Sequence, residues 1–433
     1  MLKINNVKND MHKKKIYISG FYGSRNKGDL LMLLGLLGFI RDRLSVDVTV
    51  STLYNPKIDK NVVPKIYFVQ SLGTITNLSD KFIIFLSYYF LKLVPNKFGV
   101  SVVKTFSPDY RKSITEIANS HMLITTGGPF ALETTKLLFG MKISSFNYTA
   151  FLLELLVAKS LNIPYAVLGQ SFGSLHTMFG KSNFKFILES STFIYSRESG
   201  GVSLLRKSLN LKKEILILPD LAFYSKIFSL SDIDNINIEE KVKNTKYAVI
   251  NVRFMSLKEL QYLFDTDCTD ENILHERYFL VVSDIIHFLY TSHKFTFFVF
   301  FNQAVINDGR AAKRVITKTN LPYDMFWSTP DNLSIESMIS LFKKSEFALT
   351  TRYHSLIISL ITKKPVCPIC YNPKISYLLD DIKINVPCLS GEQFTCQFFM
   401  TSFCKSLFLY DSSLVDDAST KLKNGLHDLF DFF

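Results

Sequence analysis

The chain has 433 residues, of which 47% are hydrophobic and 20% are charged. This composition is typical of a globular protein and excludes an intrinsically disordered chain. Because the length exceeds what one ordinary core needs, two domains are expected. The formal charge of +12 favours an anionic partner, such as phosphorylated small molecules, an acidic lipid surface or nucleic acid. Solvated surface lysines would give the same excess, so charge alone does not choose among these partners.

The first strand and helix signals follow a polar N-terminal tail, residues 1–14, which lacks the apolar core of a secretory signal. Residues 15–228 are predicted to form the first domain. It opens with a buried strand over 15–20, a glycine-rich loop, a helix over 30–44 and an alternating strand over 46–53. This order is typical of a doubly wound α/β domain. Later strands of the same domain are expected at 121–125, 165–168, 193–196 and 215–218.

Residues 82–94, FIIFLSYYFLKLV, form a strongly apolar run that ends at Val94, before Pro95. The run is shorter than the roughly 20 residues that a membrane-spanning helix needs. Two interpretations remain: a core helix, or an interfacial helix whose neighbouring lysines, Lys81, Lys92 and Lys97, suit a membrane surface.

The polar, acidic segment 229–246 is predicted to connect the first domain to a second one, residues 247–433, which ends in helices. Its strands are expected at 247–252, 295–301, 347–350 and 365–370, and its helices at about 278–292, 308–319, 335–344 and 354–362. Two consecutive doubly wound domains predict an α/β fold with a cleft between them. Ligands of such folds bind at the carboxyl ends of the strands.

Cys367 and Cys370 form a C-x-x-C pair within an apolar run. No second pair and no histidine stand at zinc-finger spacing from them, which favours a buried strand with reduced thiols over a metal site. We therefore expect a cytoplasmic protein without a bound metal.

Two glycine turns follow strands of the first domain and lead toward helices. Backbone N–H groups at a helix start favour an anion, and glycines allow its close approach. A plain tight turn, capped by Asp29 in the first case, is the alternative. The candidate anion-binding residues are Gly23, Asn26, Gly28, Asp29, Gly127 and Gly128.

Arg197 comes directly after the strand at 193–196, so its guanidinium is expected at the ligand-binding edge of the sheet. It would clamp a carboxylate or a phosphate there in bidentate fashion. The alternative is a structural ion pair with Glu198 or Asp220.

Arg352 and His354 follow the strand at 347–350, with His354 in the first turn of the next helix. The helix dipole disfavours a charged imidazole at that position. This suits a histidine that exchanges a proton near neutral pH, so His354 is the candidate acid or base.

In this order, the segments resemble the polysaccharide pyruvyl transferase family, whose fold is similar to that of GT-B glycosyltransferases. The family's first motif, G-x-x-G-x-x-N-x-G-D-E, is matched at Gly20, Gly23, Asn26, Gly28 and Asp29. Leu30 replaces its last acidic residue, and Pro129 replaces the third glycine of the central G-G-G. The remaining matches are Arg197, Pro219, Asp220, Arg352, His354, Pro365, Tyr371 and Lys374.

The resemblance implies two Rossmann-like doubly wound domains facing a GT-B-like cleft. It also implies transfer of a pyruvyl group from phosphoenolpyruvate to a sugar of a cell-surface polysaccharide or of its lipid-linked precursor. The product would be a pyruvate ketal, with release of phosphate and without a metal, a cofactor or nucleic acid. Arg197 and Arg352 would bind the donor with support from Lys374 or Arg253, and His354 would transfer protons.

Two other functions fit parts of the sequence. A GT-B glycosyltransferase with a nucleotide-sugar donor would have the same fold, because fold does not fix function. The absence of a clear acidic ribose-binding residue in the second domain disfavours it. A non-catalytic polysaccharide-assembly protein would explain Leu30 and Pro129, although the presence of Arg197, Arg352 and His354 argues for catalysis.

Overall fold

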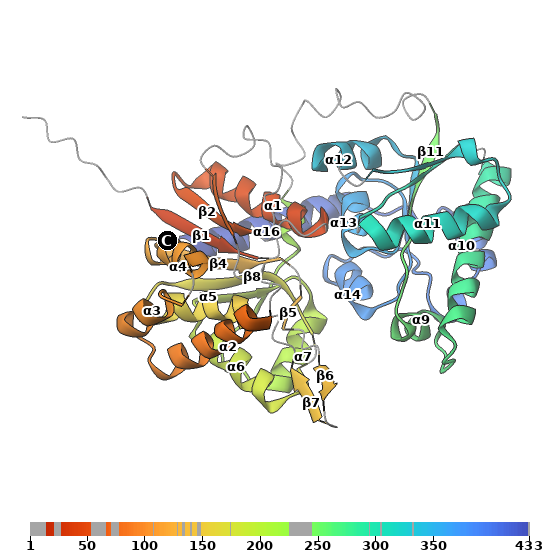
Figure 1. The fold of residues 1–433 in the computed structure, drawn as a ribbon. Helices are drawn as coiled ribbons and strands as arrows, with labels where there is room; N and C mark the ends of the chain where they lie inside the picture. The colour runs from red at the N-terminus through yellow and green to blue at the C-terminus, as the bar shows by residue number, and fades with distance from the viewer. Residues whose placement is uncertain are drawn as a thin grey trace, which may run out of the picture.

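The computed structural model of the protein describes residues 14–20, 27–52, 66–70, 78–106, 108–127, 129–131, 135–138, 141–144, 149–173, 175–224, 245–293, 295–303, 305–330 and 333–431. Within them lie two parallel sheets with interleaved helices, one in each half of the chain (Figure 1). The predicted α/β class and the two Rossmann-like domains are therefore confirmed.

The first sheet has the strand order β10–β9–β8–β4–β1–β2–β3, with β5 beside β8. Its strands are β1 (Lys15–Ser19), β2 (Asp47–Thr52), β3 (Ile66–Gln70), β4 (Met122–Thr126), β5 (Pro129–Ala131), β8 (Tyr165–Phe172), β9 (Phe193–Ser196) and β10 (Leu216–Ile217). The helices of this half are α1 (Lys27–Arg43), α2 (Leu78–Leu93), α3 (Lys97–Val103), α4 (Pro108–Ala118), α5 (Thr149–Ser160), α6 (Met178–Ser190) and α7 (Ser199–Leu209). A hairpin, β6 (Thr135–Leu138) with β7 (Met141–Ser144), and the short 3-10 helix η3 (Leu221–Phe223) complete it.

Alternation along β1 divides the core between the two faces of the first sheet. Ile16 and Ile18 pack in a hydrophobic cluster with α1, whereas Tyr17 packs in a second cluster with helices α2 to α7. Such alternation follows from the two-residue period of a strand. Both faces are covered, as parallel sheets require.

The second sheet has the order β13–β12–β11–β14–β15, the same winding as the first. Its strands are β11 (Tyr247–Asn251), β12 (Phe297–Phe300), β13 (Phe326–Ser328), β14 (Phe347–Thr350) and β15 (Val366–Pro368). The helices are α9 (Leu257–Phe264), α10 (Glu271–His293), α11 (Val305–Thr319), α12 (Ile335–Lys344), α13 (Tyr353–Ile361), α14 (Pro373–Asp381), α15 (Cys396–Cys404) and α16 (Ser413–Phe430), with 3-10 turns η6 (Tyr323–Met325) and η7 (Gly391–Gln393).

Each sheet has one point where the strand order reverses, at β1 and β4 in the first sheet and at β11 and β14 in the second. Loops that leave neighbouring strands there diverge, which opens space for a ligand at the carboxyl edge. The loop before α1 follows β1, and Arg352 and His354 follow β14. The fold thus brings the motifs singled out in the sequence to the ligand-binding edges.

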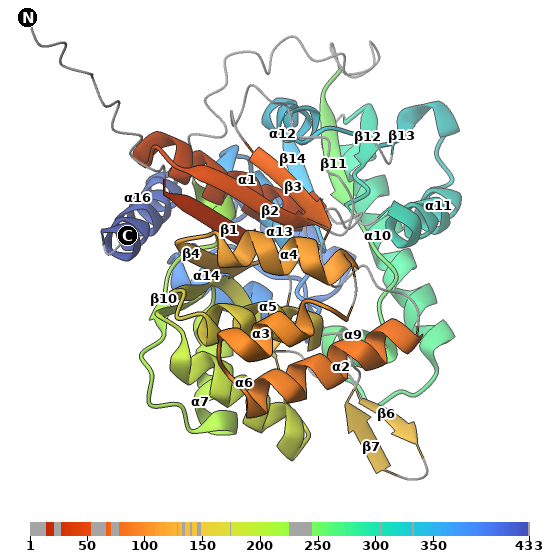
Figure 2. The ribbon, with the colours of Figure 1, turned by 60° about the vertical axis from the view of Figure 1, so that its left-hand side comes forward.

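The terminal helix α16 crosses back to the first domain (Figure 2). Phe430 packs on Phe39 of α1 with the ring centroids 5.4 Å apart, and Gly425 lies against Leu218. The predicted boundary at residue 247 does not anticipate this return, since an amphipathic helix pattern does not say which domain receives its apolar face.

Helix α2 contains the apolar run from the sequence and presents apolar side chains on two sides. Ile84 and Tyr88 are buried in the core, while Phe82, Leu86 and Leu93 are 58%, 46% and 81% exposed. No helix in the described part of the chain is long and apolar enough to cross a membrane. The core interpretation accounts for one side of α2 and leaves the other side unexplained.

Close packing of α1 on η3 depends on Gly35, because a Cβ at this position would lie 2.0 Å from the carbonyl oxygen of Leu221. We expect Gly35→Ala to destabilise the protein by about 1–3 kcal/mol, as overpacking in cores does. Gly309→Ala in α11 is the control, since its Cβ would meet only the Asn302 side chain at 3.7 Å. Thermal melting of both variants tests this, and equal stability would contradict the packing argument.

Candidate functional site

Three side chains from three separate elements meet between the two sheets. Arg197 follows β9, Asp220 precedes η3, and His354 is the second residue of α13. The Nη1 atom of Arg197 lies 2.8 Å from Asp220 Oδ2 and 3.4 Å from His354 Nε2. Asp220 Oδ2 is 3.7 Å from the same imidazole nitrogen. All three residues are buried, so the cluster joins the two domains at a water-poor point.

The surroundings of His354 favour the neutral form of its imidazole. Arginine stays protonated and donates, so its partner nitrogen Nε2 accepts and carries no proton. Burial lowers the pKa of His354 well below its usual value, and the charges of Arg197 and Lys374 lower it further. The sequence predicts a lowered pKa for His354 from the helix dipole. In the structure the pKa is lowered by burial and by the charges of Arg197 and Lys374.

The Arg197–Asp220 pair is buried and hydrogen-bonded. Burial raises the pKa of Asp220, and Arg197 opposes that effect. Burial alone would lower the pKa of Arg197, but Asp220 above all outweighs it and the net pKa is raised. Asp220 also accepts a hydrogen bond from the Ala222 amide, and Arg197 Nε donates to Ser171 Oγ at 2.7 Å. The sequence left Arg197 either as an anion clamp or as the partner of a structural ion pair. The structure contains the ion pair, with Asp220.

The start of α1 forms the wall behind His354. A Cβ on Gly28 would lie 2.1 Å from His354 Nδ1, so only glycine lets the imidazole approach this closely. Asp29, the next residue of α1, is also buried. Gly127 directly follows β4 and has a φ of +84°, a conformation that favours glycine. Gly23, Asn26 and Gly128 lie outside the described residues.

A second group of cations surrounds the buried ring of Tyr371. Arg253 Cζ lies 4.9 Å and Lys374 Nζ 5.5 Å from the ring centroid. Burial would raise the pKa of Tyr371, but Lys374, Arg253 and Arg352 outweigh it and the pKa is lowered. Lys374 acts on both His354 and Tyr371, so the two groups form one electrostatic site.

The predicted donor-binding cations differ in their partners. Arg352 holds buried Asp308 through two guanidinium nitrogens, Nε and Nη2, and Arg253 pairs with Glu259 at 3.2 Å. Lys374 forms no ion pair with a carboxylate among the described residues, although its charge and that of Arg197 oppose the rise that burial causes in the pKa of Glu198. It is therefore the best-placed cation of the four to meet an incoming anion without first breaking an ion pair.

Four residues of this site have no functional role predicted from the sequence. Tyr371 stands there only as a motif match, Glu198 only as a possible partner of Arg197, Asp220 as both, and Tyr353 as neither. The Arg197 guanidinium lies 4.5 Å above the Tyr353 ring. Glu198 Oε2 and the Tyr353 hydroxyl are buried without a hydrogen-bond partner. The Pro219-Asp220 pair after a strand was a usable signal for Asp220, but nothing in the local pattern distinguishes Glu198 or Tyr353 from core residues.

The lowered pKa of His354 makes stability depend on pH. Unfolded histidine binds a proton below about pH 6.5, whereas folded His354 resists it, so stability falls as pH drops below that value. At about pH 5.5 the loss from this residue approaches 1.4 kcal/mol. We expect His354→Gln to remove this part of the loss in urea titrations at about pH 7.5 and 5.5. An unchanged pH dependence would contradict a buried, neutral His354.

Solved structures similar to this one include several UDP-GlcNAc 2-epimerases of low sequence identity. The UDP-GlcNAc 2-epimerase from Methanocaldococcus jannaschii has a TM-score of 0.56 at 13% identity and covers 96% of this chain and 99% of its own. The enzyme from Neisseria meningitidis bound to UDP-GlcNAc has a TM-score of 0.54 at 10% identity, with 96% and 98% covered. At these identities the likeness shows the two-domain fold alone.

The family comparison is more specific. No curated protein matches the chain in sequence. The sequence model described as polysaccharide pyruvyl transferase matches residues 26–373, most of the chain, including Arg197, Asp220 and His354. The chain belongs to the polysaccharide pyruvyl transferase family.

Proposed function

We propose that the protein transfers the pyruvyl group of phosphoenolpyruvate to two hydroxyls of one sugar, forming a cyclic ketal and releasing phosphate. The observation that carries this proposal is the buried imidazole of His354, which contacts Arg197 and whose pKa is lowered by burial and by the charges of Arg197 and Lys374. Phosphoenolpyruvate carries a phosphate and a carboxylate, so its site needs cations in two directions. The proposed donor ligands are Arg197, Arg352, Lys374 and Arg253.

The proposed reaction needs one group that both gives and takes a proton. One sugar hydroxyl adds to C2 of the enol while C3 gains a proton and becomes the methyl group. The second hydroxyl then forms the other C–O bond at C2 and loses its proton, while phosphate leaves with the C2–O bond pair and takes up that proton. We assign these proton transfers to His354, since no metal or organic cofactor is needed for them.

Donor binding would prepare His354 for this role. Arg197 and Lys374 lower its pKa in the free protein. The negative charges of phosphoenolpyruvate would offset both cations and raise the pKa of His354 toward neutral pH, so that the imidazole could take up a proton. The proton needed at C3 would therefore be loaded as the donor arrives.

The principal rival is transfer from a nucleotide sugar, because similar folds bind UDP-GlcNAc. The family match favours pyruvyl transfer over it. The presence of Arg197, Lys374 and His354 in one cluster disfavours a non-catalytic role. We place the reaction in the cytoplasm, where a polysaccharide or its lipid-linked precursor would be the acceptor.

Phosphoenolpyruvate should stabilise the protein against heat, since a ligand that binds only the folded state adds about 2.7 kcal/mol at about 100 times its Kd. UDP-sugars should give no shift. Differential scanning fluorimetry with both ligands decides between the two donors. A shift with a UDP-sugar and none with phosphoenolpyruvate would favour the glycosyltransferase.

The exposed side of α2 would rest on a membrane and bring the site to a lipid-linked acceptor. Phe82, Leu86 and Leu93 recur at helical spacing on that side, and Phe98 of α3 is 68% exposed beside them in sequence. Lys97 stays exposed, whereas Lys92 turns inward to Asn183 at 2.9 Å. An interfacial helix binds through such apolar side chains together with nearby cations.

Liposome flotation tests this contact. The protein should float with anionic vesicles at low salt and be released by salt. Leu93→Asp should abolish flotation, while Leu409→Asp, also at an exposed leucine (58%), should not. Flotation of the Leu93→Asp variant at the wild-type level would leave α2 as a core helix.

A further inference from the structure

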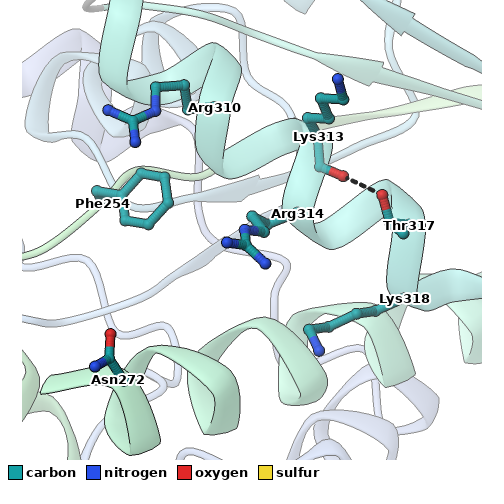
Figure 3. A pocket seen from close by; sticks show the side chains of 7 residues that line it. All are labelled: Phe254, Asn272, Arg310, Lys313, Arg314, Thr317 and Lys318. Carbon is teal, nitrogen blue, oxygen red and sulfur yellow. Dashed lines mark hydrogen bonds between the residues drawn. The ribbon is translucent and has the colours of Figure 1, made fainter. Parts of the chain in front are cut away.

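Helix α11 carries a basic groove that the proposed donor site does not use. The groove has a volume of about 640 Å³ and lies between α11 and the start of α10 (Figure 3). Its lining residues are Phe254, Asn272, Arg310, Lys313, Arg314, Thr317 and Lys318. Four of these seven are cations and none is acidic, so the groove favours an anion.

Three of the cations form a row along one side of the helix. Arg310, Arg314 and Lys318 are spaced by four residues and therefore stand on the same face of α11. In Figure 3, Arg314 and Lys318 project toward α10, whereas Lys313 points away from it. Lys318 pairs with Glu276 of α10. Arg310 and Arg314 form no ion pair within the described part of the chain.

The length of this row indicates the kind of anion. Arg310 and Lys318 stand eight positions apart, about 12 Å along the helix, which is longer than a single phosphate group. Two linked phosphates would contact Arg310 and Arg314 together. Arginine suits this contact because its planar fork binds phosphate oxygens in pairs.

The groove adjoins the proposed donor site at one end. Phe254 follows Arg253, whose Nε donates to the Phe254 carbonyl at 3.1 Å. Arg310 stands two residues after Asp308, the partner of Arg352. The Phe254 ring makes edge contacts with the rings of His275 and Phe279, with centroid distances of 5.1 and 5.3 Å. The guanidinium carbon of Arg310 lies 5.5 Å from the Phe254 ring centroid. A ligand in the groove would thus lie next to Arg253, one of the proposed donor cations.

We propose that this groove, defined by Arg310, Arg314 and Lys318, binds the diphosphate group of the acceptor, a glycosyl diphosphate whose sugar receives the pyruvyl group. The assignment of the ligand as acceptor rests on the proposed function. The groove fixes the acceptor by charge, while His354 and the donor cations act on its sugar.

The test uses inorganic pyrophosphate as the probe, titrated calorimetrically at low salt into three proteins. Arg310→Gln with Arg314→Gln should weaken pyrophosphate binding at least about tenfold, which corresponds to about 1.4 kcal/mol. Lys343→Gln with Lys344→Gln removes the same charge from exposed positions at the end of α12 and should bind like the wild type. Inorganic phosphate should bind the wild type more weakly than pyrophosphate does.

Equal pyrophosphate affinity in all three proteins would overturn the proposal that the groove binds a diphosphate. So would displacement of pyrophosphate by phosphoenolpyruvate, because the probe would then occupy the donor site. If the Arg310/Arg314 variant loses flotation on anionic vesicles but keeps its pyrophosphate affinity, the cations serve a lipid surface and the proposal is wrong. A missing thermal shift with phosphoenolpyruvate in the wild type refutes the donor instead, so the two failures are distinguishable.

Discussion

The buried ion pair between Arg197 and Asp220 fixes the chemistry of this site. A charge in a low-dielectric interior is costly unless it is paired and hydrogen-bonded. Asp220 supplies the pair at 2.8 Å, and Ser171 and the Ala222 amide satisfy further bonds. The held guanidinium then faces His354, and burial together with this charge lowers the pKa of its imidazole. One electrostatic arrangement therefore sets both the anion affinity of the site and the proton state of its histidine.

This arrangement exists only because two similarly wound sheets direct their carboxyl edges toward each other. Arg197 comes from the first sheet and His354 from the second, and Gly28 lets the start of α1 touch the imidazole. Since each partner comes from a different domain, the site is complete only when the domains are packed. The return of α16 to α1 adds a second connection between them.

Much of the fold is predictable because buried parallel strands are apolar runs that end at glycine or polar residues. The strands at 193–196 and 347–350 match β9 and β14, which places Arg197, Arg352 and His354 at the correct edges. Partners are harder to predict, since contacts such as Arg352 with Asp308 join residues 44 positions apart. The periodicity of α2 also cannot show which of its apolar side chains pack in the core and which stay exposed. Likewise, sequence periodicity cannot show that Glu198 is buried beside Arg197.

The most direct test of the account measures turnover and donor affinity in the same His354→Gln variant. Phosphate release should fall by roughly two to four orders of magnitude, the usual contribution of general acid–base catalysis. Phosphoenolpyruvate affinity should be largely retained, because Arg197 and Lys374 still supply charge. Arg197→Lys should instead lose affinity, since lysine keeps the charge without the bidentate fork. Full activity of His354→Gln would contradict the account, and joint loss of binding and turnover would make His354 a donor ligand rather than the proton carrier.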